Sequence, residues 1–164
     1  MRHIKKMSGT VRDRKFAKFV DAAGIGIVFD ATDSEDFEKI KGFIRDLKTL
    51  SRKVQAVGFV DNKVTPSYLY PKSDIDLFNR KELIWGFKPA SPYIQTFLKE
   101  KWGLLIDVNM RERVPLFYLS AASAATCKIG RLTDFNLLDH EILISLRPEE
   151  GLDFYLKQVM RYMT

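Results

Sequence analysis

Apolar runs alternate along the chain with segments in which apolar residues recur at helical spacing. One run covers residues 25–29 and ends in Asp30, and a second covers residues 54–60 and ends in Asp61. Between them, residues 37–50 carry apolar side chains three and four positions apart, with charged side chains on the opposite face. Two continuous apolar runs joined by an amphipathic helix predict a parallel strand–helix–strand unit.

The alternation continues to the C-terminus. The pattern predicts short strands over 82–87, 104–109, 127–130 and 141–146, and helices over 91–102, 115–125 and 152–163. Residues 62–81 contain two prolines and clustered Asn, Ser and Asp residues, which predict a connection over the surface. Strands that alternate with helices indicate the α/β class. We expect a three-layer, Rossmann-like domain with a mostly parallel sheet of about five to six strands and helices on both faces.

Thr32, followed three residues later by Glu35, predicts a capping box at the start of the first long helix. Gly24, Gly26 and Gly58 lie before or inside predicted strands, where we expect them to permit close packing.

The length and composition are those of one globular domain. Hydrophobic residues make up 46% and charged residues 29% of the 164 residues. No apolar run approaches the roughly 20 residues of a membrane-spanning helix, and the N-terminus lacks a signal-peptide pattern. We therefore expect a cytoplasmic protein. Cys127 is the only cysteine, which excludes an intrachain disulfide and a cysteine-based zinc site.

Most of the net charge of +6 lies in an N-terminal arm, residues 1–23, which carries +5 and precedes a single domain over residues 24–164. The arm is predicted to contain a short helix over residues 10–22. A basic arm favours an anionic partner, here nucleic acid or an acidic protein surface. The alternative is a solvated leader that only aids solubility. The candidate anion-binding residues are the cations of the arm: Arg2, Lys5, Lys6, Arg12, Arg14, Lys15 and Lys18.

Three predicted strands end in aspartate, namely Asp30, Asp61 and Asp107. Ligands of open α/β sheets bind beyond the carboxyl ends of the strands. If these three strands are neighbours, their carboxylates converge on one crevice, together with Asn109 and the arginines that follow it. Such carboxylates can hold Mg²⁺, and Arg111 and Arg113 can clamp a phosphate. The alternative is that each aspartate only starts a turn or caps a helix.

The candidate ligand-binding residues are therefore Asp30, Asp61, Asp107, Asn109 and Arg111. The sequence assigns no catalytic residue, no metal site and no cofactor.

Several familiar sites have no support in the sequence. Neither Gly-x-Gly-x-x-Gly nor Gly-Lys-Ser/Thr follows a strand, and the loop after the first strand is acidic, which disfavours dinucleotide or ATP binding. The two histidines, His3 and His140, show no metal-ligand spacing. His140, between Asp139 and Glu141, is expected at the surface. Ser120 lacks the nucleophile-elbow motif of a hydrolytic triad.

Two resemblances add to this interpretation. The segments Gly-Ile-Gly-Ile-Val-Phe-Asp, Leu-Leu-Ile-Asp-Val-Asn and Ser-Ala-Ala-Ser-Ala-Ala-Thr-Cys-Lys-Ile-Gly-Arg resemble a small bacterial family of unknown function, of a type found in Bacteroidota. That resemblance runs from about residue 14 to the C-terminus and implies no activity. Residues 104–131 are also similar to the N-terminal half of heptosyltransferase-type glycosyltransferases. Those enzymes bind the nucleotide sugar with a second half that this chain is too short to contain, so we expect no complete glycosyltransferase activity.

Two functions follow as hypotheses. The first is a non-catalytic binding module whose basic arm contacts RNA or a ribonucleoprotein. The alternative is a protein or enzyme that binds a small ligand, such as a phosphosugar, in the crevice at the carboxyl ends of the strands. A structural subunit that buries its alanine-rich helix against a second copy is a third possibility, because the sequence leaves the oligomeric state open.

Overall fold

The computed structural model describes residues 23–67, 69, 74–84 and 88–163, so the predicted helix over residues 10–22 and the cations of the arm lie outside the described residues. The described elements are, in chain order, β1 (Ile25–Asp30), α3 (Ser34–Leu50), β2 (Val54–Val60), β3 (Ile75–Asn79), η2 (Arg80–Glu82), β4 (Leu83–Ile84), β5 (Lys88–Pro89), α4 (Pro92–Lys99), β6 (Leu104–Val108), α5 (Val114–Ala122), β7 (Cys127–Arg131), η4 (Asn136–Leu138), β8 (Ile142–Ile144) and α6 (Leu152–Met163).

Within the described residues, six strands form one sheet in the order β3-β2-β1-β6-β7-β8, and every neighbouring pair is parallel. Counted along the chain, these six strands follow the Rossmann order 3-2-1-4-5-6. The predicted fold class is confirmed, and so is the prediction that β1, β2 and β6 are neighbours. The winding of the chain reverses between β1 and β6, so their carboxyl ends border the crevice where such folds bind ligands.

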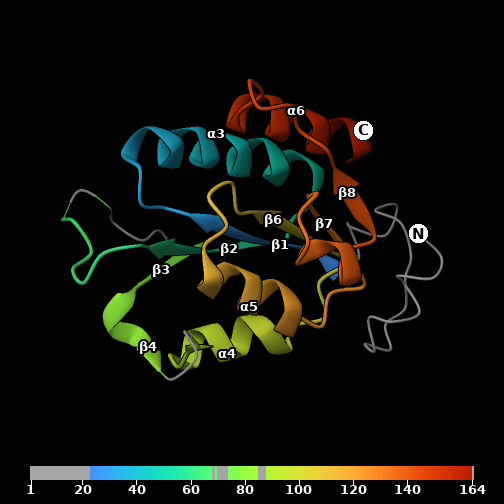
Figure 1. Cartoon of the computed structure of the whole chain (residues 1–164). Coiled ribbons are helices and arrows are strands. Elements are labelled where there is room, and N and C mark those ends of the chain that lie inside the picture. The colour runs from blue at the N-terminus through green and yellow to red at the C-terminus, as the bar shows by residue number, and fades with distance from the viewer. Residues whose placement is uncertain (1–22, 68, 70–73, 85–87, 164) are drawn as a thin grey trace.

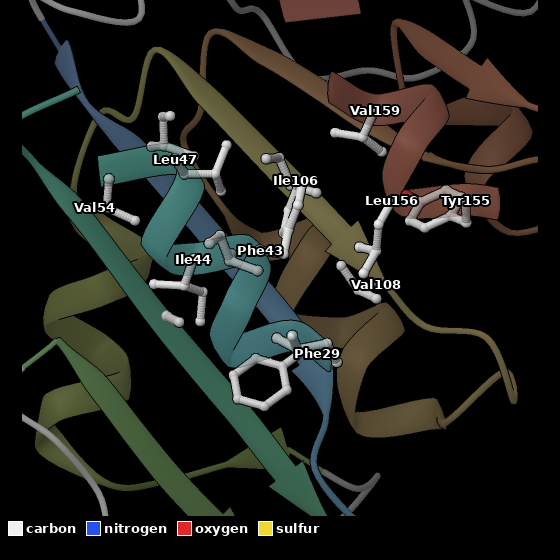
Figure 2. Close-up of a cluster of buried hydrophobic side chains, with 14 of the residues drawn as sticks. Phe29, Phe43, Ile44, Leu47, Val54, Ile106, Val108, Tyr155, Leu156 and Val159 are labelled. Atoms are coloured by element: carbon white, nitrogen blue, oxygen red, sulfur yellow. The ribbon is translucent and has the colours of Figure 1, made fainter. Parts of the chain in front are cut away.

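Helices cover both faces of the sheet. Figure 1 shows α3 and α6 on one face and α4 and α5 on the other. Between the sheet and the first pair lies a core in which Phe29 and Ile106 meet Phe43 and Leu47 of α3 and Leu156 of α6 (Figure 2). A smaller core lies beneath α4 and α5. Burial of each large apolar side chain contributes about 1.5–3 kcal/mol, so these two cores hold the layers together.

Two glycines in the central strands permit close packing, as predicted. A Cβ atom on Gly58 would lie 2.5 Å from the ring of Phe29, and one on Gly26 would lie 2.9 Å from the indole of Trp102. Any larger side chain at either position would push an aromatic ring out of its place in the core.

The segment over residues 62–81 was predicted wrongly as a connection without regular structure, because it contains the edge strand β3. Only Ile75 and Phe78 of its five residues are buried. An edge strand pairs on one side only, and its polar positions interrupt the apolar run that marked the central strands.

The predicted start of the first long helix was also wrong. Asp33, and not Thr32, is the N-cap of α3, and its Oδ1 accepts a hydrogen bond from the Asp36 amide at 2.9 Å. The Thr32 hydroxyl instead accepts a hydrogen bond from the Asp61 amide at 2.8 Å. Thr32 therefore joins the end of β2 to the loop after β1, a contact between strands that local spacing does not reveal.

Candidate functional site

The carboxyl ends of β1 and β2 bring Asp30 and Asp61 close to one arginine. Arg113, the residue that precedes α5, donates from Nε to Asp30 Oδ2 at 2.9 Å and from Nη1 to Asp61 Oδ2 at 2.6 Å. Only 4% of the Asp30 side chain is exposed, compared with 23% for Asp61 and 24% for Arg113. One guanidinium therefore neutralises a buried carboxylate and ties it to the neighbouring strand.

Asn109 holds the loop that carries this arginine. Its Oδ1 accepts a hydrogen bond from the Arg113 amide at 2.7 Å, and its Nδ2 donates to the Arg113 carbonyl at 3.0 Å. These bonds close a five-residue loop, in which Glu112 adopts a φ of 53°. A non-glycine residue in this left-handed region carries backbone strain, which the surrounding contacts must offset.

Two further arginines flank the central one. Arg80 donates from Nε to Asp61 Oδ1 at 2.6 Å. Arg111 donates from Nη1 to Asp36 Oδ2 at 2.9 Å, in the first turn of α3, and lies 3.9 Å from Asp30 Oδ2. About half of each flanking side chain is exposed, 52% for Arg80 and 46% for Arg111. These two arginines therefore present charged N–H groups to solvent.

The charges at this edge stabilise one another in their ionised forms. The hydrogen bond from Arg80 lowers the pKa of Asp61 below its usual 3.8 against the opposing effect of burial, and the charges of Arg113 and Arg80 add to the lowering. The hydrogen bonds to Asp61 and Asp36 raise the pKa values of Arg80 and Arg111, respectively. All three groups are therefore charged at neutral pH.

A pocket of about 540 Å³ opens beside these groups. Its charged lining residues come from η2, from the end of β2 and from the loop before α5, and comprise three cations and two anions: Arg80, Arg111, Arg113, Asp61 and Glu112. The lining therefore carries a small positive excess, and arginine side chains suit phosphate or carboxylate groups because they can bind them through two parallel hydrogen bonds.

The structure brings four of the five candidate residues together and separates the fifth. Asp30, Asp61, Asn109 and Arg111 lie at this edge, whereas Asp107 lies within the sheet. The parallel register pairs Asp107 with Val28, which lies two residues before Asp30. Asn109, two residues after Asp107, is therefore level with Asp30. Asp107 is only 1% exposed and contributes nothing to the pocket lining.

Asp107 instead meets a histidine. His140 Nε2 lies 3.1 Å from Asp107 Oδ2, and His140 is only 5% exposed, so the prediction of a surface histidine was wrong. Its neighbours in sequence, Asp139 and Glu141, made the segment appear solvated. The short η4 helix turns the chain so that the ring points inward, against Gly130 of β7. Buried Lys128 contacts Asp139 Oδ2 at 2.9 Å in the same region, so these two polar pairs lie largely inside the fold.

Arg80 is the cation of the pocket that the sequence analysis missed, since it lies in the segment predicted as an irregular connection. The signal that could have found it is a capping box. Asn79 Oδ1 accepts a hydrogen bond from the Lys81 amide, and Glu82 Oε2 accepts one from the Asn79 amide. This pattern of Asn followed three residues later by Glu marks the start of the helical turn that contains Arg80.

The described residues support neither a metal site nor a membrane-spanning helix. In that part of the chain, no group of three or more His, Cys, Asp or Glu side chains is arranged to hold a metal ion. Asp30 and Asp61, which share Arg113, are paired with arginine. No helix within the same ranges has the length and apolar character needed to cross a membrane.

The lowered pKa of Asp61 predicts how stability depends on pH. Its ionised form stabilises the fold fully above the ordinary pKa of 3.8, and this contribution is lost as the pH falls through the lower folded-state value. An Asp61→Asn variant should therefore be less stable than the wild type at pH 7, and the difference should narrow below about pH 4. Urea denaturation between pH 7 and pH 3 measures the free energy of unfolding of both proteins, and Asp134→Asn, which changes an exposed carboxylate, is the control. If the wild type and Asp61→Asn differ by the same free energy of unfolding at pH 7 and at pH 3, the assigned interaction of Asp61 with the arginines is contradicted.

Comparisons with known proteins give the family. A family model described as a family of unknown function, DUF6913, matches residues 2–164. No curated protein and no solved structure matches the chain. The match covers nearly the whole sequence, and the chain therefore belongs to the DUF6913 family.

Proposed function

We propose that this protein binds a small anionic ligand in the pocket at the carboxyl edge of its sheet. The observation that carries the proposal is the convergence of Arg80, Arg111 and Arg113 on one pocket beside the point where the sheet reverses its winding. A phosphate or a carboxylate group fits such a lining. Phosphosugars are among the ligands of this chemistry.

The site differs from a dinucleotide site in how it uses the first helix. In Rossmann folds that bind dinucleotides, the amides at the N-terminus of the helix after the first strand hold the pyrophosphate. Here the Asp33 side chain accepts a hydrogen bond from the Asp36 amide, and the Asp36 side chain accepts one from Arg111. Carboxylates of the chain itself therefore occupy the N-terminus of this helix, where a pyrophosphate would otherwise bind. The arginines after β6 and in η2 take over as the cationic groups that face the ligand.

Other pockets are weaker candidates. A pocket of about 550 Å³ lies at the amino ends of the strands, where Lys53 is paired with Glu100 at 2.9 Å and lies over the ring of Trp102. A groove of about 870 Å³ runs between α3 and α6. Neither lies at the edge where open α/β sheets bind ligands.

Inorganic phosphate is the simplest probe of this proposal. Titration of the wild-type protein with phosphate, at constant ionic strength with chloride as the reference anion, should give a saturable rise in Tm. Arg80→Gln should weaken phosphate binding about tenfold, because it removes one of the three cations that line the pocket and its charge-assisted hydrogen bond to the phosphate. Arg80 is the residue to change because, within the described part of the chain, its ion pair is with the partly exposed Asp61, and its removal leaves Asp30 paired with Arg113.

The matched control is Arg147→Gln, which removes an exposed arginine that lies 3.6 Å from a glutamate outside the pocket. This control should bind phosphate like the wild type. Equal phosphate affinity in the wild type and in Arg80→Gln would contradict the proposal, as would the absence of any phosphate effect in the wild type.

A second function rests on the arm of residues 1–23, which carries +5 of the net charge of +6. We propose that this arm contacts RNA or another anionic surface, independently of the pocket. Cations that neutralise phosphates release counterions, so RNA affinity should fall steeply as salt rises.

The arm is tested with single-stranded poly-uridine RNA. Binding is measured between 50 and 200 mM salt for a full-length variant in which glutamine replaces four arm cations, Arg12, Arg14, Lys15 and Lys18. If all four contact phosphates, the slope of log affinity against log salt should fall by about 3. The control replaces four exposed lysines of the body, Lys63, Lys99, Lys101 and Lys157. RNA binding that salt does not affect, or that both variants weaken equally, would rule out the arm as the contact.

A further inference from the structure

The pocket at the carboxyl edge has an apolar wall in addition to its arginines. Five apolar residues line it together with the charged groups: Phe59, Leu83, Ile84, Val114 and Pro115. Ile84 is 56% exposed and Val114 is 48% exposed, whereas Phe59 is 2% exposed. The accessible part of this wall therefore belongs mainly to two aliphatic side chains.

The chain couples these two residues to the arginines. Val114 directly follows Arg113 and is the first residue of α5, while Ile84 lies four residues after Arg80, at the end of β4. The two chain segments that bring Arg80 and Arg113 to the pocket therefore also bring one exposed aliphatic residue each to its lining. A single exposed aliphatic residue needs no explanation on a protein surface, but two that line one pocket next to three cations form a surface with two chemical halves.

We infer that the ligand of this pocket is an anion with an apolar body, such as an aryl or alkyl phosphate or carboxylate, rather than a phosphosugar. The anionic group faces the arginines, and the body covers Ile84 and Val114. This inference rests on the proposed anion-binding function and narrows the class of ligand. A sugar body would place hydroxyl groups against the aliphatic side chains, where they lose hydrogen bonds to water without gaining partners from that wall.

Three probes with the same anionic group separate these classes. The affinities of phenyl phosphate, glucose 6-phosphate and inorganic phosphate are measured by calorimetric titration of the full-length protein. Phenyl phosphate should bind at least tenfold more tightly than either of the others. A tenfold gain corresponds to about 1.4 kcal/mol, which the removal of roughly 55 Å² of apolar surface from water provides.

A double variant, Ile84→Ser with Val114→Ser, tests whether the gain comes from this wall. Both side chains are about half exposed, so their replacement leaves the core intact. The variant should lose the preference for phenyl phosphate and keep its affinity for inorganic phosphate within twofold. Val64→Ser with Leu138→Ser, which changes two exposed aliphatic residues outside the pocket lining, should behave like the wild type.

The outcomes distinguish the inference from the function beneath it. Equal binding of all three probes, or tighter binding of glucose 6-phosphate, would overturn the apolar body and leave the anion site in place. A preference for phenyl phosphate that survives in the double variant would also overturn the inference, because the ring would then lie elsewhere. If none of the three probes binds, the proposed function fails and the inference fails with it.

Discussion

The carboxyl edge of this sheet depends on the contact of Arg113 with Asp30. Asp30 ends the central strand β1 and is almost fully buried, and an ionised carboxylate in that position is unfavourable unless a cation and hydrogen bonds compensate it. Arg113 provides the cation, and the Thr32 amide donates to the other carboxylate oxygen at 3.0 Å. The same guanidinium reaches Asp61, so one side chain links the ends of β1 and β2 to the start of α5.

The rest of the edge follows from this contact. Asn109 must hold the loop after β6 for Arg113 to reach Asp30, and the loop accommodates Glu112 in a left-handed conformation as a result. With Asp61 bound to Arg113, its second oxygen is available to Arg80. Each of the three arginines that line the pocket thus has a carboxylate partner before any ligand arrives. A preorganised cationic site loses little freedom on binding, which favours affinity.

Much of the fold was readable from the sequence, because the central strands are buried on both faces and therefore appear as continuous apolar runs. Edge strand β3 escaped detection because pairing on one side leaves polar residues in its pattern. In the site, Asp30, Asp61 and Asn109 were found because strand ends share an edge. The position of Asp107 depends on register, which sets it opposite Val28, and the strand pattern alone does not contain that information. The contacts of His140 with Asp107 and of Arg80 with Asp61 likewise join segments that are distant in sequence.

A double-mutant cycle on Asp30→Asn and Arg113→Gln tests the central contact most directly. Urea denaturation of the wild type, both single variants and the double variant gives the coupling free energy between the two side chains. We expect a coupling free energy of about 1–3 kcal/mol, because Asp30 is buried and Arg113 is mostly shielded from solvent. The same cycle on an exposed pair, Lys39 of α3 and Asp153 of α6, whose Nζ and Oδ2 atoms lie 3.1 Å apart, should give a coupling free energy close to zero, because solvent screens exposed ion pairs. Equal coupling in the two pairs would contradict the dependence of the carboxyl edge on Arg113.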